Sequence, residues 1–554
     1  MQYEGPSGQR SWLLWLGLGL LLLLQALLLY DAFHVGEFKR SIPWDDCSIL
    51  DLALLRLSRA MEAGSLLGLV KRAQDLAPHS PVADIQAMLG YLVSGGQSWG
   101  PYALNSAPLV AGLVAIWPRL RRRTLVVAMA VLLLLIFQPI TVFSLTNLKA
   151  DWKGGFFAAL AVLMFGEALE TRARAAWMTA SALLGFSVLC KLTAFYMPVL
   201  GLMILGLFHL ADVWSGGEAS GASARPSIAG VARALLGRWR AILVDTALVA
   251  GPYALFFFYG AHSHFNIIKY IRHALSETWT DGLTPLARAA VYAPPANAAW
   301  GPLGVLLPVL AVASLAVAVL RRDGRFAQPL WLGVLAAGLL AGPLVFARTS
   351  NIEFSGPFVG LCLGFTLVML VRLGSLSVWA GRAALLAAVA TVAFTSFDSY
   401  RRPLTPAEDA EQAYAVGAYT GLVRQIAALE GGNDTNLTIL YEDSLVPQSN
   451  LSLFYFDRTG HRLNIDRTDE IPATPADVAK FASYEYILLL APDPGIAAPG
   501  YQPSKFLYLT GHAAEAKAYV DRLAGYEQLR SEPWKNGRLE LYRRRPAVTT
   551  AAAP

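Results

Sequence analysis

The sequence predicts a polytopic α-helical membrane protein with a small C-terminal α/β domain. Of its 554 residues, 55% are hydrophobic and only 15% are charged, and the mean hydropathy is +0.45. A water-soluble fold of this size cannot hide so much apolar surface. Apolar runs long enough to span a bilayer recur up to residue 397, and the composition beyond that point is that of a soluble domain. We therefore expect a membrane domain, 1–397, and a soluble domain, 398–554.

Eleven apolar runs are the expected transmembrane helices, because about 20 apolar residues cross a hydrocarbon core about 30 Å thick. The first run is longer than the apolar part of a signal peptide, and no small-residue cleavage site follows it, so we expect a retained anchor. Lys191 interrupts a stretch that we interpret as two spans. The runs are 12–31, 104–118, 124–145, 155–170, 176–190, 193–212, 241–260, 302–320, 327–346, 356–372 and 383–397.

Arginine clusters between the runs predict the topology. Cytoplasmic loops carry an excess of Lys and Arg, and placing every cluster inside lets all eleven runs alternate in direction. The formal net charge of +6 therefore reflects topology and does not indicate a nucleic-acid partner. We expect a bacterial inner membrane protein with a cytoplasmic N-terminus and a periplasmic C-terminal domain. The clusters lie in 119–123, 172–174, 238–240, 321–325 and 372–382.

The segments outside the membrane fall into four groups. Two outer loops are expected, 32–103 and 261–300, and the first contains candidate amphipathic helices at 49–57 and 85–92. The inner segment 213–240 is rich in Gly, Ala and Ser and predicts a flexible linker. In the C-terminal domain, alternating strands and helices indicate an α/β fold. The expected strands are 437–441, 484–490 and 539–542, and the expected helices are 475–481 and 513–523.

Adjacent carboxylates, Asp45 and Asp46, follow the first apolar run on the predicted outer face. One reading is structural: if a helix begins at Cys47, Asp46 is its N-cap. The other is chemical: a carboxylate at the water boundary can act as a general base toward an acceptor hydroxyl. The two roles are compatible, since one residue of the pair can cap the helix while the other takes the proton.

Four features of the first 200 residues occur in a characteristic order: Asp45-Asp46 after the first run, His79-Ser-Pro-Val82 in the same loop, Asp151 near the fourth run, and a segment starting at Gly185 that ends in Lys-Leu-Thr. This order resembles the GT-C membrane glycosyltransferases that use polyprenyl-phosphate sugars, including protein O-mannosyltransferases and lipid A aminoarabinose transferases. In that family the acidic pair is usually Asp-Glu and the histidine motif is His-Pro-Pro-Leu. The departures here leave the subfamily open.

The resemblance implies an inverting transfer of a sugar from an undecaprenyl-phosphate donor to an envelope glycan, lipid or protein acceptor on the outer face. Asp45 is the first choice for the base, Asp46 is the second, and Asp151 would orient acceptor or sugar. Cations near the departing phosphate would stabilise its charge, and we expect two or three of the outer or rim cations to contact it. The candidates are Arg56, Lys71, Arg72, Lys149, Lys153, Lys191, Lys269, Arg272 and Arg348, with His79 as a further substrate contact.

No cofactor is predicted. His262 and His264 could face one metal ion, but no third ligand accompanies them, and the three cysteines are too far apart in sequence to suggest a metal cluster or disulfide framework. Two other function classes stay open. A secondary transporter would show repeated halves, which this sequence lacks, and a non-catalytic envelope polysaccharide assembly factor would work through its C-terminal domain. The sequence does not specify the sugar or the acceptor.

Overall fold

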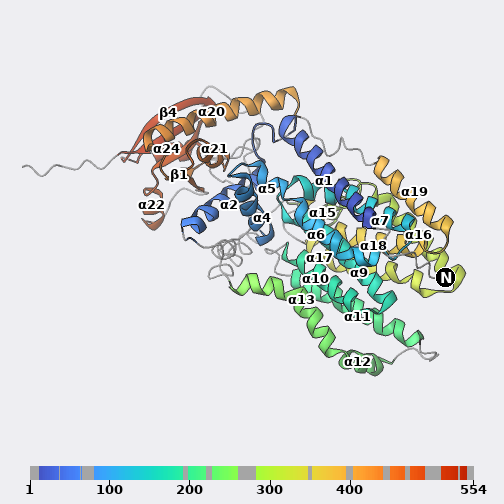
Figure 1. Cartoon of the computed structure of the whole chain (residues 1–554). Helices are drawn as coiled ribbons and strands as arrows, with labels where there is room; N and C mark the ends of the chain where they lie inside the picture. The colour runs from blue at the N-terminus through green and yellow to red at the C-terminus, as the bar shows by residue number, and fades with distance from the viewer. Residues whose placement is uncertain are drawn as a thin grey trace, which may run out of the picture. The chain divides into compact units, whose positions relative to one another are not determined.

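The computed structural model describes most of the chain and divides it into two compact units. One unit comprises Met1–Asp31 and Arg56–Arg402, and the other comprises Ala32–Leu55 and Pro403–Pro554 (Figure 1). The second unit thus groups 32–55 with the C-terminal residues, whereas the sequence-based boundary falls at residue 397. The described residues are 11–36, 38–62, 64, 80–190, 197–219, 227–259, 282–346, 352–394, 404–440, 449–467, 475–492, 513–523, 525–534 and 537–545.

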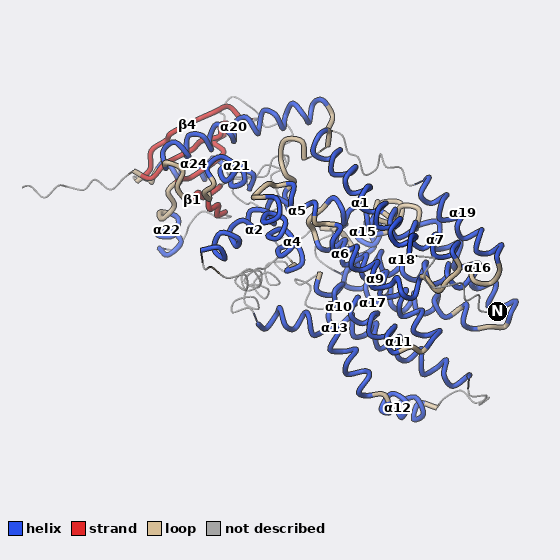
Figure 2. Tube along the Cα trace, viewed as in Figure 1, coloured by secondary structure: helices blue, strands red, loops and turns tan. Residues whose placement is uncertain are grey.

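The first unit is helical (Figure 2). A helix overlaps each of the eleven predicted runs. By length and composition, seven helices can cross a membrane, and α7 with α8, bent by 49°, makes an eighth if the pair is one span. The polytopic helical prediction is confirmed, but eleven spans exceed what this criterion supports, because helices such as α10 and α19 are short. The helices are α1 (Ser11–His34), α6 (Ser106–Leu120), α7 (Leu125–Phe137), α8 (Pro139–Thr146), α9 (Ala150–Thr171), α10 (Arg174–Leu189), α11 (Met197–Ala219), α13 (Trp239–Tyr259), α16 (Leu303–Arg321), α17 (Gln328–Phe346), α18 (Gly356–Gly374) and α19 (Val378–Phe394).

Shorter helices connect these elements. The amphipathic segments expected at 49–57 and 85–92 lie in α2 (Trp44–Glu62) and α4 (Pro81–Ser94). The predicted linker 213–240 is partly helical: α11 reaches Ala219, and Ser227 caps α12 (Ile228–Gly237) by accepting a hydrogen bond from the Gly230 N–H. The linker interpretation was therefore wrong for these parts. The remaining short elements are α5 (Trp99–Ala103), α15 (Pro285–Tyr292), η2 (Gly324–Phe326) and η3 (Ile352–Ser355).

Helices α9 and α18 pack backbone against backbone. Gly356, Gly360 and Gly364 recur every four residues on one face of α18. A Cβ at Gly360 would lie 2.0 Å from the carbonyl oxygen of Gly155, and one at Gly356 would lie 2.6 Å from that of Asp151. Small residues permit this approach between membrane helices. The contact fixes the start of α9, where Asp151 lies.

Replacing Gly360 by valine should force α9 and α18 apart. Because the obstructing atom is backbone, it cannot rotate away, and we expect the free energy of unfolding to fall by at least about 2 kcal/mol. Gly338 on α17 has open space around its Cβ position, so Gly338→Val is the control and should change stability by about 0.5 kcal/mol or less. Thermal unfolding of the detergent-solubilised variants measures both, and equal melting temperatures would contradict this packing.

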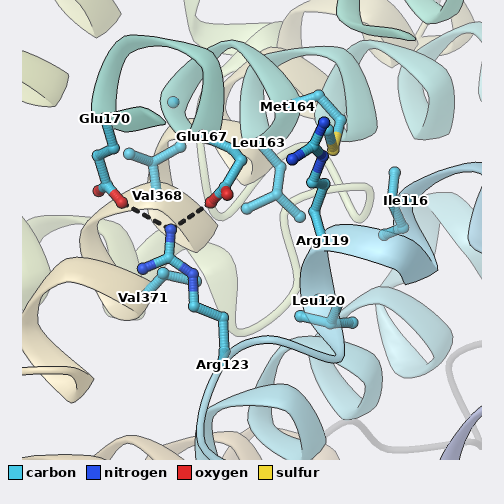
Figure 3. Close-up of a pocket in the computed structure, with 11 residues that line it drawn as sticks. Ile116, Arg119, Leu120, Arg123, Leu163, Met164, Glu167, Glu170, Val368 and Val371 are labelled. Atoms are coloured by element: carbon cyan, nitrogen blue, oxygen red, sulfur yellow. Dashed lines mark hydrogen bonds and ion pairs between the residues drawn. The ribbon is translucent and has the colours of Figure 1, made fainter. Parts of the chain in front are cut away.

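Ion pairs join several helices at one end of the first unit, here called the arginine end. Arg123 binds Glu167 and, at 2.6 Å, Glu170 (Figure 3). Arg372 binds Glu170 at 3.1 Å. Further pairs at this end are Arg174 with Asp245 and Arg238 with Asp212, and Arg372 also donates to the Arg325 carbonyl. Each of the five predicted arginine clusters contributes a residue to these contacts.

A small cavity lies at the arginine end between α6, α9 and α18 (Figure 3). Its volume is about 30 Å³, and apolar side chains such as Leu163 and Val368 line it beside Arg119 and Arg123. That volume is about that of one water molecule, whereas ligand pockets usually measure about 300–1,000 Å³. It is too small to hold a sugar donor.

The second unit contains a five-stranded mixed sheet of order β2-β1-β3-β5-β4, in which β1 pairs in parallel with β2 and β3, while β5 pairs antiparallel with β3 and β4. The three predicted strands and both predicted helices are present. Strands β2 and β4 and two helices were not predicted. The elements are α20 (Pro406–Glu430), β1 (Thr435–Ile439), α21 (Ser449–Thr459), β2 (Leu463–Arg467), α22 (Pro475–Phe481), β3 (Tyr486–Pro492), α24 (Ala513–Asp521), β4 (Tyr526–Trp534) and β5 (Gly537–Arg544).

Candidate functional site

The acidic pair lies in the first turn of α2. That helix begins at Trp44, three residues before the position expected from sequence, so Asp46 is inside the helix and the N-cap interpretation was wrong. Carboxylates in a first turn interact favourably with the helix dipole, by about 0.3–1 kcal/mol each. The side chain of Asp46 is buried, at 1% exposure. The side chain of Asp45 lies outside what the structure describes.

The backbone before the acidic pair is held by a buried asparagine. Asn450 on α21 accepts a hydrogen bond from the Ile42 N–H at 2.9 Å and donates one to the Ile42 carbonyl at 3.0 Å. A few residues later, Asp51 accepts a hydrogen bond from Ser452 and lies 3.6 Å from Arg462. These contacts fix α2's first turn within the second unit.

A second anchor lies earlier in the same segment. Arg40 donates to both carboxylate oxygens of Asp409, at 2.8 and 3.2 Å, and Lys39 binds the same carboxylate at 3.1 Å. The Arg40 hydrogen bond, followed by that from Lys39, lowers the pKa of Asp409 to about 2. Asp409 is thus the shared partner of both cations and stays ionised to lower pH than an ordinary aspartate.

Asn450→Ala should make the backbone around Asp45 and Asp46 more mobile. The change removes two hydrogen bonds and leaves the buried Ile42 peptide without them, at a cost of about 1–3 kcal/mol for each unsatisfied group. We expect faster amide hydrogen exchange at 38–50 in this variant. Asn436→Ala, at an exposed position of β1, is the control and should leave exchange there unchanged. Equal exchange in the two variants would show that Asn450 does not hold this segment.

The first unit carries the other predicted carboxylate, at the end opposite the arginine end. Asp151 is half-buried in the first turn of α9. Lys153 is fully buried, and its ammonium donates to the carbonyls of Asn147 at 3.2 Å and Leu148 at 3.5 Å. Lys149 forms an ion pair with Glu353 of η3. A segment of seven residues thus presents two cations and one carboxylate.

Two hydrogen bonds place further elements beside this segment. Ser187 of α10 donates to the Gly154 carbonyl at 2.7 Å, and Ser80, the N-cap of α4, donates to the Leu189 carbonyl at 3.2 Å. The C-terminal end of α10 therefore adjoins the first turns of α9. Lys191 follows that end by two residues and lies outside the described residues.

Arg56, a predicted phosphate ligand, is buried against a carboxylate. Its guanidinium lies 2.9 Å from Asp84 in the first turn of α4, and the two side chains are 3% and 0% exposed. A phosphate could bind Arg56 only in competition with Asp84. The contact gives Arg56 a structural role, and its role as a donor ligand stays a prediction.

The structure describes five of the predicted site residues to the level of the side chain: Arg56, Asp46, Lys149, Asp151 and Lys153. It brings the last three together. His79, Lys71, Arg72, Lys191, Lys269, Arg272 and Arg348 lie outside the described residues, as do His262 and His264. Within the described ranges, no group of three His, Cys, Asp or Glu side chains could hold a metal ion.

Several polar residues near the Asp151 end were not predicted. Arg288 of α15 is 5% exposed and donates to the carbonyls of Val345 at 2.9 Å and Leu283 at 3.0 Å. Asn297 donates to Ser355 of η3 at 2.7 Å. The Thr284-Pro285 helix start was a sequence signal for α15, but nothing local indicated that Arg288 would be buried.

No family model and no curated protein matches this chain. Solved structures do match. ArnT from Cupriavidus metallidurans bound to undecaprenyl phosphate aligns with a TM-score of 0.53 and 14% identity, covering 99% of this chain and 100% of that one. The apo state of ArnT from the same organism gives 0.52 and 12%, covering 95% and 98%. The chain therefore has the fold of ArnT along nearly its whole length, and the predicted GT-C-like membrane fold with a C-terminal sheet domain is confirmed.

Proposed function

We propose that this protein is an inverting glycosyltransferase that moves a sugar from an undecaprenyl-phosphate donor to an envelope glycan, lipid or protein acceptor. The observation that carries the proposal is the near full-length similarity to ArnT, whose solved structure holds undecaprenyl phosphate. That lipid phosphate is the leaving group of the proposed reaction. The order of acidic and basic motifs in the sequence supports the same class.

The proposed step is a single displacement. The acceptor hydroxyl oxygen attacks the anomeric carbon, the bond from that carbon to the phosphate oxygen breaks, and the polyprenyl phosphate leaves with the bonding electrons. The hydroxyl proton passes to a carboxylate, with Asp45 as the first choice and Asp46 as the second. Asp151 would orient acceptor or sugar from the first turn of α9.

Cations would stabilise the phosphate as its charge develops. Lys153 is a described candidate, because its buried ammonium lies beside Asp151 in the first turn of α9 and donates to the carbonyls of Asn147 and Leu148. Lys149 would have to exchange its contact with Glu353 for the phosphate. We propose Lys191 as a further ligand from its position after α10. The other proposed contacts to the donor are His79, Arg56, Lys269, Arg272 and Arg348.

We further propose that the Asp151 end faces the periplasm of a bacterial inner membrane. The gathering of arginine clusters at the opposite end supports this orientation through the positive-inside rule. The donor head group would then meet Asp151 at the outer leaflet, and the second unit would be periplasmic.

Lipid binding tests the proposal without requiring the acceptor. Purified protein in nanodiscs is photolabelled with a diazirine-bearing undecaprenyl phosphate and the labelled peptides are mapped. We expect labelling near 147–153 and the end of α10, competed by unlabelled undecaprenyl phosphate but not by undecaprenol, which lacks the phosphate. Equal competition by the two lipids would refute a phosphate-dependent donor site.

A further inference from the structure

The junction of α12 and α13 carries a continuous apolar stripe that the proposed reaction does not use. Seven residues of α12 and the start of α13 line an open recess of about 440 Å³. We call them the α12 stripe. Its members are Ala232, Leu235, Leu236, Trp239, Ile242, Leu243 and Thr246. Three of their large side chains are exposed, Leu236 by 69%, Trp239 by 55% and Leu243 by 58%, and Leu235 and Ile242 are half-buried.

The position of the α12 stripe indicates what covers it. No residue of α12 is buried, although the helix is rich in apolar residues, as in helices that lie in a membrane interface. The stripe runs on into α13, which coincides with a predicted span. Trp239 stands at the junction, and tryptophan is enriched at the membrane boundary. Lipid is therefore the expected cover of this open, exposed surface.

Arg233 and Arg240 lie on the same two helices as the stripe. Arg240 stacks on Trp239, with its guanidinium carbon 5.4 Å from the ring centroid. Within the described ranges, Arg233 has no hydrogen bond or ion pair. The carboxylates nearby are neutralised: Asp212 pairs with Arg238, and buried Asp245 pairs with Arg174 and His209. Arg233 and Arg240 are therefore the arginines of this segment that can bind a negatively charged group.

We infer that the α12–α13 junction binds an anionic phospholipid of the leaflet at the arginine end. One acyl chain lies along the α12 stripe, and the phosphate binds Arg233 and Arg240. An anionic head group adds no positive charge of its own, whereas the quaternary amine of phosphatidylcholine is repelled by the same arginines. Basic pockets beside membrane helices recognise acidic lipids on these grounds.

Photolabelling of the full-length protein tests the site. Phosphatidylglycerol and phosphatidylcholine carrying the same diazirine acyl chain are compared at low salt in phosphatidylcholine nanodiscs, and label in 228–246 is measured by mass spectrometry. Each arginine near an anionic head group is worth about fivefold in binding. We expect phosphatidylglycerol to label this segment at least about fivefold more, and Arg233→Gln/Arg240→Gln to abolish the difference.

The matched control is Arg321→Gln/Arg382→Gln. It removes the same charge from the same end of the unit, including an arginine that stacks on Trp379 at 4.8 Å, and should preserve the preference. Equal labelling by the two lipids, or a preference that survives Arg233→Gln/Arg240→Gln, would overturn the inference. So would chain-to-chain crosslinks through the α12 stripe, which would assign it to a second copy. Donor sugar is absent throughout, so the result is independent of the proposed transferase activity.

Discussion

Asp45→Asn is expected to bind donor lipid and lose sugar transfer by about 10²- to 10⁴-fold, the usual effect of removing a general base. The amide keeps the shape of the side chain but cannot accept the proton from the acceptor hydroxyl. Single-turnover release of polyprenyl phosphate measures the chemical step, and photolabelling with the lipid measures binding. Both are needed, because a loss of binding would also abolish turnover.

Asp46→Asn is the matched variant. Successive residues of a helix point about 100° apart, so one member of the pair can face the acceptor while the other supports the helix. Asp46 is the buried member, at 1% exposure, and we expect its replacement to lower stability more than transfer. Asp151→Asn should impair transfer. An active Asp45→Asn beside an inactive Asp46→Asn would reverse the assignment, and activity in both would refute the general-base mechanism.

Arg56→Met is expected to lower the free energy of unfolding by about 3–5 kcal/mol, because it leaves the Asp84 carboxylate buried without its cation. Asp84 is 0% exposed and lies 2.9 Å from Arg56. Asp84→Leu should be comparably destabilising, because it leaves the buried Arg56 guanidinium without its carboxylate partner. The double variant should recover much of the loss, because apolar side chains often replace a buried ion pair without cost.

Thermal unfolding of the three variants in detergent measures the loss of stability. Donor photolabelling tests whether Arg56 instead binds the donor phosphate. If Arg56 binds the donor phosphate, Arg56→Met will lose lipid labelling while its melting temperature stays near that of the wild type. Additive losses in the double variant would also contradict the structural assignment, since the two residues would then be energetically independent.

The membrane helices could be predicted because hydropathy is a local property of the sequence. Of the five strands of the sheet, only the three central ones were predicted from the sequence. Strands β1, β3 and β5 occupy the three middle positions, and their inward-facing residues are apolar, such as Leu437, Leu488 and Leu541, whereas β2 and β4 are the edges. In β4, exposed polar residues and Pro533 suit an edge strand but obscure the pattern that identifies a strand.

Partners distant in sequence could not be predicted. Lys149 and Glu353 are 204 residues apart, and Ile42 and Asn450 are 408 apart. Only the fold brings them together. The Asn450 contacts are among those that group 32–55 with the C-terminal residues in the second unit. The candidate cations and carboxylates could be identified from the sequence, but the residues that they contact could not.

The most direct test of the proposed function is turnover of a labelled donor. Purified protein in nanodiscs is supplied with undecaprenyl phosphate carrying a radiolabelled sugar and with an envelope extract as acceptor. We predict that free undecaprenyl phosphate and labelled acceptor appear in equal amounts, and that Asp45→Asn forms neither at a comparable rate. An intact donor after prolonged incubation with acceptor extracts, despite phosphate-dependent lipid binding, would contradict a transferase and favour a transporter or an assembly factor.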